Sequence, residues 1–281
     1  MIQTCVVSYD LKVFNNLLLH PKIRVYFELC LFFLSHIFIF YFFYTSTVIN
    51  TVWIVVSVLF SFLLCCFGQD IGAHRFFSHQ SFKTVKVVSV VLLFFETIGC
   101  YGSALDWRIS HLTHHQFTDT EDDPTNPKVL GIFFILSNLW KIKALNNRSQ
   151  HVVQFQNKIY LKTKDPAILF FHVYYLLIIS LWLLTLFLVA GFLGIVFFFA
   201  IPMLYSAYVL NLISYLNHTF GEARSEKSLA RNFLFINIFL PGAGWHRNHH
   251  ENPKNYRFNT KYDLGGFIIE NFLMLKSENK I

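Results

Sequence analysis

Two long stretches without a charged side chain dominate this sequence. Residues 30–69 and residues 166–221 contain no Asp, Glu, Lys or Arg. A helix needs about 20 apolar residues to cross a bilayer, so each stretch is long enough for two crossings. Buried helices of a soluble protein are disfavoured, because 14% of the residues are charged against about 25% in soluble domains. We predict an all-α integral membrane protein with two hairpins, 29–67 and 168–216, whose four transmembrane helices are 29–44, 48–67, 168–189 and 193–216.

The distribution of basic residues predicts which side of the membrane the rest of the chain occupies. Lys and Arg lie before the first hairpin, between the hairpins and after the second one, and neither expected turn is charged. Positively charged loops favour the cytoplasmic face. We expect both termini to be cytoplasmic, with a cytoplasmic cap of 68–165 and 217–281, in one domain of residues 1–281. Because the basic residues flank apolar spans, the +7 charge does not indicate a nucleic-acid partner.

Nine of the 13 histidines gather in four places near the ends of the expected spans. Imidazole is a common ligand of zinc, copper and iron, and nine imidazoles exceed what one ion can hold. We therefore predict two metal ions. The candidate ligands are His74 and His79 in HRFFSH, His111, His114 and His115 in HLTHH, His218, and His246, His249 and His250 in HRNHH. The other four, His20, His36, His151 and His172, are expected to have other roles.

The spacing of these histidines predicts their geometry. In HLTHH and HRNHH they stand at positions i, i+3 and i+4, which share one face of a helix. Two such faces could meet across a cavity, with His218 at the membrane level of His74. His74 and His79 are five residues apart, about 140° around a helix of 3.6 residues per turn. Either the helix unwinds there or these two side chains serve different metals.

Three shorter apolar segments are expected to lie along the membrane interface. A crossing by residues 87–105 would place His79 and His111 on opposite faces, so they could not share a site. The carboxylate of Glu96 should face protein or water, because a charge in lipid is costly. Residues 129–140 and 232–241 are expected to be interfacial too.

Several kinds of chemistry remain open for an all-histidine site. Each cluster taken singly could consist of surface or packing histidines. Zinc would suit hydrolysis, although a catalytic zinc commonly has three protein ligands, whereas a redox pair beside a lipid chain suits oxygen activation. A haem-binding electron carrier would need axial histidines within facing spans, and a metal transporter would need ionisable groups at mid-membrane. The five cysteines form no CxxC motif, which disfavours a thiolate zinc site.

The histidine motifs together resemble those of the membrane fatty acid desaturase family, most closely its acyl-CoA delta-9 (stearoyl-CoA) branch. GAHRFFSHQSF (72–82), DWRISHLTHHQFTDTEDDP (106–124) and GAGWHRNHHENP (242–253) resemble the three histidine boxes. NHTFG (217–221) resembles the segment with the isolated ninth histidine. The hairpin layout extends the resemblance over most of the chain.

The resemblance implies a reaction. Two iron ions held by the nine histidines would use O₂ and two electrons from a separate donor, of cytochrome b5 or ferredoxin type. The product would be a cis double bond, at delta-9, in a saturated acyl chain carried by coenzyme A or a lipid. The boxes do not distinguish this enzyme from a histidine-box lipid hydroxylase or ketolase, which stays the alternative.

Four further residues are candidates for supporting roles. By the resemblance, Trp107 would line the acyl tunnel, with an interfacial aromatic anchor as the alternative. Asp106, Asp119 and Asp123 could orient metal-bound imidazoles by accepting their second N–H, or they could be solvated surface acids.

The sequence departs from the family pattern in four places. Ser214 stands where the family has an asparagine that helps to hold one iron through water. Ala243 replaces the glutamate of the third box, and Thr125 replaces the histidine after the Asp-Pro pair. Ile109-Ser110 replaces the Arg-Asp pair that animal acyl-CoA enzymes use at the coenzyme A head group. Acyl-carrier and acyl-lipid substrates are therefore open as well.

Overall fold

The computed structural model describes residues 20–46, 50–146, 148–222 and 228–275 of the chain. Within these residues the fold is helical, and the β pairing is one isolated bridge between Glu222 and Asn232. The elements are α2 (Pro21–Thr45), α3 (Thr51–Leu63), η1 (Leu64–Ser78), α4 (Lys86–Ile98), α5 (Ala104–Phe117), α6 (Pro127–Leu136), α7 (Trp140–Asn146), α8 (Gln150–Lys162), α9 (Pro166–Val173), α10 (Tyr175–Ile195), η2 (Val196–Ala200), α11 (Ile201–Thr219), η3 (Leu234–Ile238), α12 (His246–Glu251), α13 (Leu264–Ile268) and η4 (Ile269–Leu273).

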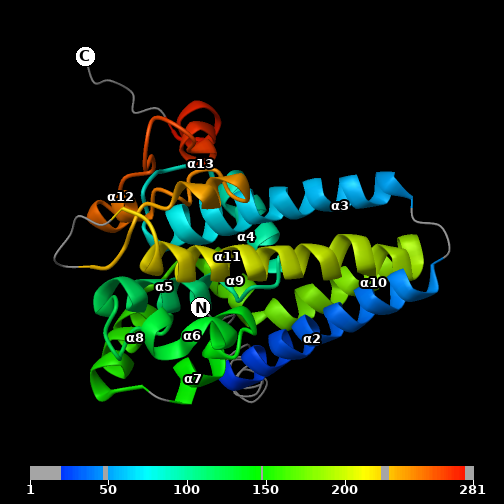
Figure 1. Ribbon diagram of the computed structural model, residues 1–281, viewed down its shortest axis with the longest axis horizontal. Coiled ribbons are helices and arrows are strands. Elements are labelled where there is room, and N and C mark those ends of the chain that lie inside the picture. Colours follow the sequence, from blue (N-terminus) through cyan, green and yellow to red (C-terminus); the bar gives the residue numbers. More distant parts are fainter. Residues whose placement is uncertain (1–19, 47–49, 147, 223–227, 276–281) are drawn as a thin grey trace, which may run out of the picture.

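The long helices form one end of the molecule and the short helices form the other. Figure 1 shows α2, α3, α10 and α11 running side by side, with a head of shorter helices, α5 to α8 and α12, gathered at one end of them. Within the described residues, three helical segments are long and apolar enough to cross a membrane: Pro21–Thr45, Thr51–Ser78 and Tyr175–Thr219. The predicted helical class and the membrane-length apolar helices are thus confirmed.

The third of these helices is broken at Gly191, where the chain reverses direction. Gly191 has φ 60° and ψ −145°, a conformation that glycine adopts without a steric penalty. After the turn the two arms touch, because a Cβ on Gly194 would lie 2.5 Å from the carbonyl oxygen of Leu186. The reversal lies within the turn predicted near residues 190–194, and in Figure 1 the arms α10 and α11 lie beside each other.

The helix α2 begins eight residues before the predicted span, and it includes three charged side chains, Lys22, Arg24 and Glu28. Arg24 and Glu28 are buried there. Each is paired with an opposite charge from the head, at 2.7 Å between Arg24 and Asp106 and 2.8 Å between Lys141 and Glu28. An uncharged stretch marks only the part of a helix that faces lipid, so counting charges placed the start of this helix too late.

The outer surface of the long helices is apolar. Phe40, Leu188 and Val189 are 72–80% exposed, whereas Phe42 and Phe197 pack against each other inside the bundle. Exposing so much apolar surface to water is unfavourable, whereas lipid tolerates it. The arrangement is that of helices surrounded by a bilayer.

The apolar segment after the first histidine motif forms α4, which is too short to cross a membrane. It packs along η1, where Gly68 allows the two backbones to touch, and Glu96 is fully buried in protein. Burial raises the pKa of Glu96 well above its usual value, which favours the protonated form of this carboxyl group. The expectation that Glu96 faces protein is confirmed.

Replacing Gly68 with alanine is expected to destabilise the protein, although alanine is a better helix former by about 1 kcal/mol. The added Cβ would lie 2.7 Å from backbone atoms of Phe95 and Glu96, and overpacking typically costs about 1–3 kcal/mol. Thermal unfolding in detergent, followed by circular dichroism, measures the difference. Val87→Ala, at an exposed position of α4, is the control. A Gly68→Ala protein as stable as the parent would contradict the close approach of α4 and η1.

Candidate metal centre

The nine candidate histidines meet at the end of the long helices that adjoins the head. They come from η1 and the residue after it, from α5, from α11 and from α12. Within each of two groups, one potential ligand atom per residue lies within 4.8 Å of all the others. Group one is His74, His79, His111, His115 and His249, and group two is His114, His218, His246 and His250. Sequence segments more than 170 residues apart therefore build one compact site.

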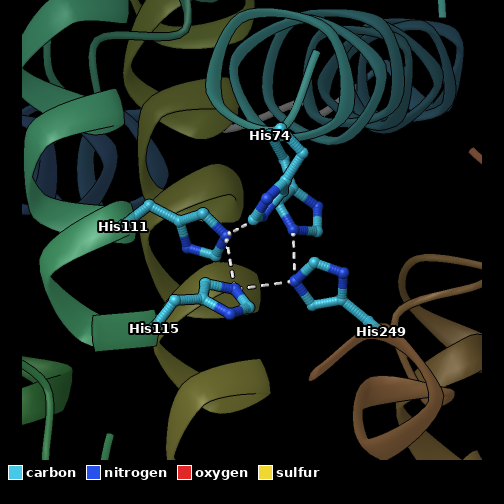
Figure 2. Close-up of side chains that lie close together, drawn as sticks. His74, His111, His115 and His249 are labelled. Carbon is cyan, nitrogen blue, oxygen red and sulfur yellow. Dashed lines mark hydrogen bonds between the residues drawn. The ribbon is translucent and has the colours of Figure 1, made fainter. Parts of the chain in front are cut away.

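The Nε2 atoms of each group point at a common centre. In group one, the Nε2 atom of His249 lies 3.0 Å from that of His74 and 2.9 Å from that of His115, and Figure 2 shows these ring tips converging. In group two, the Nε2 atom of His246 lies 3.0 Å from that of His218 and 3.1 Å from that of His250. Each group thus forms a cluster of nitrogen donors.

The helix type explains the five-residue spacing of His74 and His79. η1 is a π-helix, whose backbone bonds join residues five apart. The N–H of His79 donates to the carbonyl of His74 at 3.1 Å, so both rings lie on one face and both join group one. The predicted unwinding is wrong, because the helix widens instead of ending, and the two residues do not divide between the groups.

The i, i+3, i+4 motifs each contribute to both groups. From α5, His111 and His115 enter group one and His114 enters group two. From α12, His249 enters group one, whereas His246 and His250 enter group two. A single turn of helix therefore fixes the separation of the two groups.

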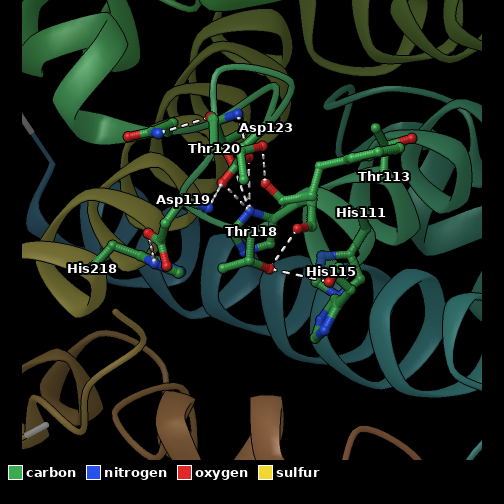
Figure 3. Close-up of polar contacts among 12 residues, drawn as sticks. His111, Thr113, His115, Thr118, Asp119, Thr120, Asp123 and His218 are labelled. Atoms are coloured by element: carbon green, nitrogen blue, oxygen red, sulfur yellow. Dashed lines mark hydrogen bonds and ion pairs between the residues drawn. The ribbon is translucent and has the colours of Figure 1, made fainter. Parts of the chain in front are cut away.

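Carboxylates contact the Nδ1 atoms of three of these imidazole rings. Asp123 lies 2.9 Å from Nδ1 of His114. Asp119 lies 2.9 Å from Nδ1 of His218, and Figure 3 shows these two side chains facing each other. The positions predicted for these two acids are those expected of residues that orient imidazoles. Asp70 plays the same part for His74, at 3.5 Å, and was missed, although an acid four residues before a histidine on a helix was a readable signal.

The donor set fits metal ions. A neutral imidazole carries one N–H, and in His114 and His218 that hydrogen is donated from Nδ1 to an aspartate. Their Nε2 atoms then present lone pairs to other imidazoles about 3 Å away. Lone pairs that converge in this way are the arrangement that a bound metal cation requires. All-nitrogen ligation suits iron, zinc or copper.

The buried environment keeps most of these imidazoles in the neutral form that binds metal. Burial, and then the neighbouring imidazoles, lower the pKa of His79 to about 2. The same causes lower the pKa values of His111, His115, His246, His249 and His250. Burial acts in the same direction on His114, but Asp123 outweighs it and raises the pKa of His114.

Asp106 does not belong to this site, so its predicted role is wrong. Its carboxylate lies 2.7–2.8 Å from the guanidinium of Arg24 and accepts a hydrogen bond from Ser103. The one histidine near it is His172, at 3.8 Å, which is outside both groups. Asp106 is adjacent to the second histidine box in sequence, but Arg24, 82 residues away, determines its position.

The four remaining histidines have other partners or face solvent. His36 contacts Tyr208 through Nε2 at 2.8 Å, and Nδ1 of His172 lies 2.6 Å from Oγ of Ser103. His20 accepts a hydrogen bond at the start of α2. His151 is exposed on α8, where a polar loop was expected.

Two polar residues that sequence reasoning did not assign hold the histidine helices in place. The side-chain oxygen of Asn232 accepts the backbone N–H of Arg247 at 3.0 Å, which caps the first turn of α12. Arg75 is fully buried, donates to Asp70 and to the carbonyl of Tyr256, and pairs with Asp263. It thereby ties η1 to the segment that follows α12. The local sequence did not indicate that Asn232 contacts α12 or that Arg75 contacts Tyr256 and Asp263.

An apolar cavity opens onto the histidines. Its walls include His74, His111, Trp107, Trp140 and Leu210, together with Ser214 and Ala243, two of the departures from the family pattern. The indole of Trp107 stacks on the ring of His111, with 5.7 Å between ring centroids. Trp107 therefore lies where a tunnel wall was predicted, and its contact with substrate stays a prediction.

Replacing Asp123 with asparagine is expected to weaken metal binding in group two by roughly 10–100-fold. The amide is a weaker acceptor for Nδ1–H of His114 and can present a donor in its place. Metal content after dialysis against graded chelator, measured by plasma mass spectrometry, tests this. Glu121→Gln, at an exposed position of the same loop, is the control. Equal metal retention in Asp123→Asn and the parent would contradict the role of Asp123.

Comparison with known proteins points to one family. The family model described as fatty acid desaturase matches residues 66–260, which include all nine histidines. The chain is 30% identical over 219 residues to the sn-1 stearoyl-lipid 9-desaturase of Anabaena variabilis, covering 76% of each protein. It is 28% identical over 228 residues to the hex-5-enoyl-[acyl-carrier protein] acetylenase of Moorena producens, covering 73% of this chain and 70% of that protein. It is 26% identical over 247 residues to an acyl-CoA desaturase of Cyprinus carpio, covering 78% and 69%.

Proposed function

The chain belongs to the fatty acid desaturase family and is an oxidoreductase that acts on fatty acyl chains, and from this we propose that it is a membrane-bound di-iron desaturase. It would introduce a cis double bond, at delta-9, into a saturated acyl chain. The observation that carries the proposal is the pair of converging histidine groups beside an apolar cavity.

In this proposal the nine histidines hold two irons. Bound iron would supply the oxidising power: O₂, two electrons and two protons are consumed as two neighbouring methylenes lose two hydrogens, and two waters form. The protein supplies position and shelter. Asp119, Asp123 and Asp70 fix the orientation of three rings, and the cavity beside Trp107 holds the chain away from water.

We propose that the electrons come from a separate carrier, of cytochrome b5 or ferredoxin type. Support comes from a surface depression of about 570 Å³ on the head, lined by His115, His250, Arg247 and Phe117. One histidine of each group is reached there, on the side away from the apolar cavity. A carrier bound over this depression could approach both groups.

A histidine-box hydroxylase or ketolase is the alternative. The same hydrogen removal could end in oxygen insertion, and the acetylenase among the relatives illustrates that products vary within the family. Gas chromatography of lipids from a desaturase-deficient host expressing the chain separates the two. New monoenes support the proposal, and hydroxylated or oxidised chains support the alternative.

Replacing either His114 or His249 with alanine is expected to abolish the product. Each removes one nitrogen from one group, and the loss should exceed the roughly 10–100-fold effect of removing a hydrogen-bonding partner of a metal ligand. Product per inserted protein in the same host measures it, with His151→Ala as the control. Activity retained in both alanine variants would reject the proposed centre.

We further propose that the chain crosses the membrane four times as one domain, with both termini and the metal centre on the cytoplasmic side. The reversal at Gly191 and the basic residues of the head support this. The exposed apolar residues Phe133 of α6 and Ile238 of η3 would then lie in the interface.

Thiol labelling in a variant without the five native cysteines tests this topology. A cysteine placed at Ala190 should react with an impermeant reagent added outside intact cells, because it lies next to Gly191, where the chain reverses direction. A cysteine at Lys254 should react only after permeabilisation. The reverse pattern would overturn the proposed orientation.

A further inference from the structure

A second cavity, of about 290 Å³, adjoins the histidine cavity. The two cavities share Tyr101, Trp107, Ser110 and Trp140 in their walls. The outer cavity, called the mouth below, is bordered by the first turn of α2, by α7 and by α8. An acyl chain that reaches the histidines through it would leave its head group in the mouth.

The charges that line the mouth nearly cancel. Its cationic residues are Arg24, Lys141 and Arg148, and its acidic residues are Glu28 and Asp106. Arg24 holds Asp106 at 2.7 Å and Lys141 holds Glu28 at 2.8 Å. Two of the three cations are therefore already committed to carboxylates of the protein.

These ion pairs are firmly built. Arg24, Glu28 and Lys141 are all less than 10% exposed, and Lys141 also donates to the carbonyl of Tyr101. Drawing Lys141 toward a ligand would leave the buried carboxylate of Glu28 without compensation, which is strongly unfavourable. Drawing Arg24 away would leave the carboxylate of Asp106, whose side chain is 31% exposed, without its ion-pair partner. Although burial opposes its ionisation, Arg24 holds the pKa of Asp106 at about 2, so this acid keeps its charge at physiological pH.

The third cation, Arg148, lies at the exposed rim. Its Nη1 donates to Gln156 at 2.9 Å and its Nε to the carbonyl of Leu145 at 3.2 Å, which fixes the guanidinium beside the opening. The neighbouring polar side chains, Asn157 and Tyr160 of α8, are uncharged. Among the residues that the structure describes, the mouth thus offers a ligand one positive charge outside an ion pair and several neutral hydrogen-bonding groups.

The mouth also adjoins the apolar bundle. Pro21 and Val25 of its wall are in the first turns of α2, and His172 belongs to α9, which precedes the apolar α10. These helices enter the bundle at the mouth, so a lipid could reach it by lateral movement.

On the proposed function, we infer that the substrate is an acyl chain esterified to a membrane glycerolipid whose head group carries at most one phosphate. A coenzyme A thioester carries several phosphate charges and would meet one rim arginine beside two ion pairs whose charges already cancel. A phosphodiester lipid or an uncharged glycolipid meets a mouth of matching charge.

Competition between substrates tests this. Purified protein with iron, in nanodiscs, is given reduced electron donor and two stearoyl substrates with different isotopic labels, one in phosphatidylcholine and one as the coenzyme A thioester. Mass spectrometry of the intact products reads each carrier separately. We expect a product ratio of about tenfold or more in favour of the lipid.

The outcomes of this competition distinguish a failure of the inference from a failure of the proposed function. Equal or faster desaturation of the thioester, or product on an added acyl-carrier protein only, overturns the inference and leaves the desaturase intact. No double bond on any carrier rejects the proposed function and the inference with it.

Variants of the rim give a second test. Arg148→Gln should slow desaturation of the phosphatidylcholine-bound chain by several-fold, and Arg148→Lys should restore most of the rate because it keeps the charge. Lys254→Gln, an exposed cation outside the mouth, is the matched control. If Arg148→Gln slows only the thioester reaction, the inference is wrong.

Discussion

The close approach of imidazole nitrogens is the constraint on which this structure depends. Nε2 atoms stand about 3 Å apart within each group. One Nε2 atom can take part in only one N–H···N hydrogen bond, so a nitrogen that contacts two others, as that of His249 does, cannot satisfy both contacts by hydrogen bonding. The protein must therefore hold the rings rigidly from outside. Carboxylates behind the rings, helices that fix their spacing and buried ion pairs that lock those helices all serve this requirement.

The buried Arg75 shows how far the support extends. Its guanidinium lies between Asp70, which contacts His74, and Asp263, which follows the third histidine motif. A Cβ on Gly242 would lie 2.6 Å from Asp263 and 2.9 Å from Arg75, so this position must be glycine for the pairing to form. The ion pairs of Arg75 thereby connect the helix that bears His74 to the segment that follows α12, the helix of His249. The second box is fixed separately, through Asp123, and the third through the Asn232 cap.

Local patterns in the sequence predicted what local physics controls. Uncharged stretches gave the long helices, and the i, i+3, i+4 spacing gave the shared faces of α5 and α12. The nine histidines were found because they stand out in a chain with few polar groups. The π-helical widening of η1 was not predicted, because the local sequence pattern does not distinguish a π-helix from an α-helix. Asp106 was misassigned, and Asn232 was left without a role, for one reason: the partner of each lies far away in the chain, and only the fold brings Arg24 or α12 to it.

The same distant contacts connect the mouth to the metal centre. Tyr101 and Trp140 lie in the walls of both cavities, and both donate to the side-chain oxygen of Asn211, at 2.5 Å and 3.2 Å. The amide of Asn211 in turn donates to Asn138 at 3.0 Å. Four side chains from three separate regions thus form a bonded partition inside an otherwise apolar space, where satisfied polar networks are rigid. Lys141, beside Trp140, also donates to the carbonyl of Tyr101 and to Glu28, so hydrogen bonds connect the charged lining of the mouth to this partition. The spacing between the rim and the histidines is therefore supported by a polar network as well as by apolar packing.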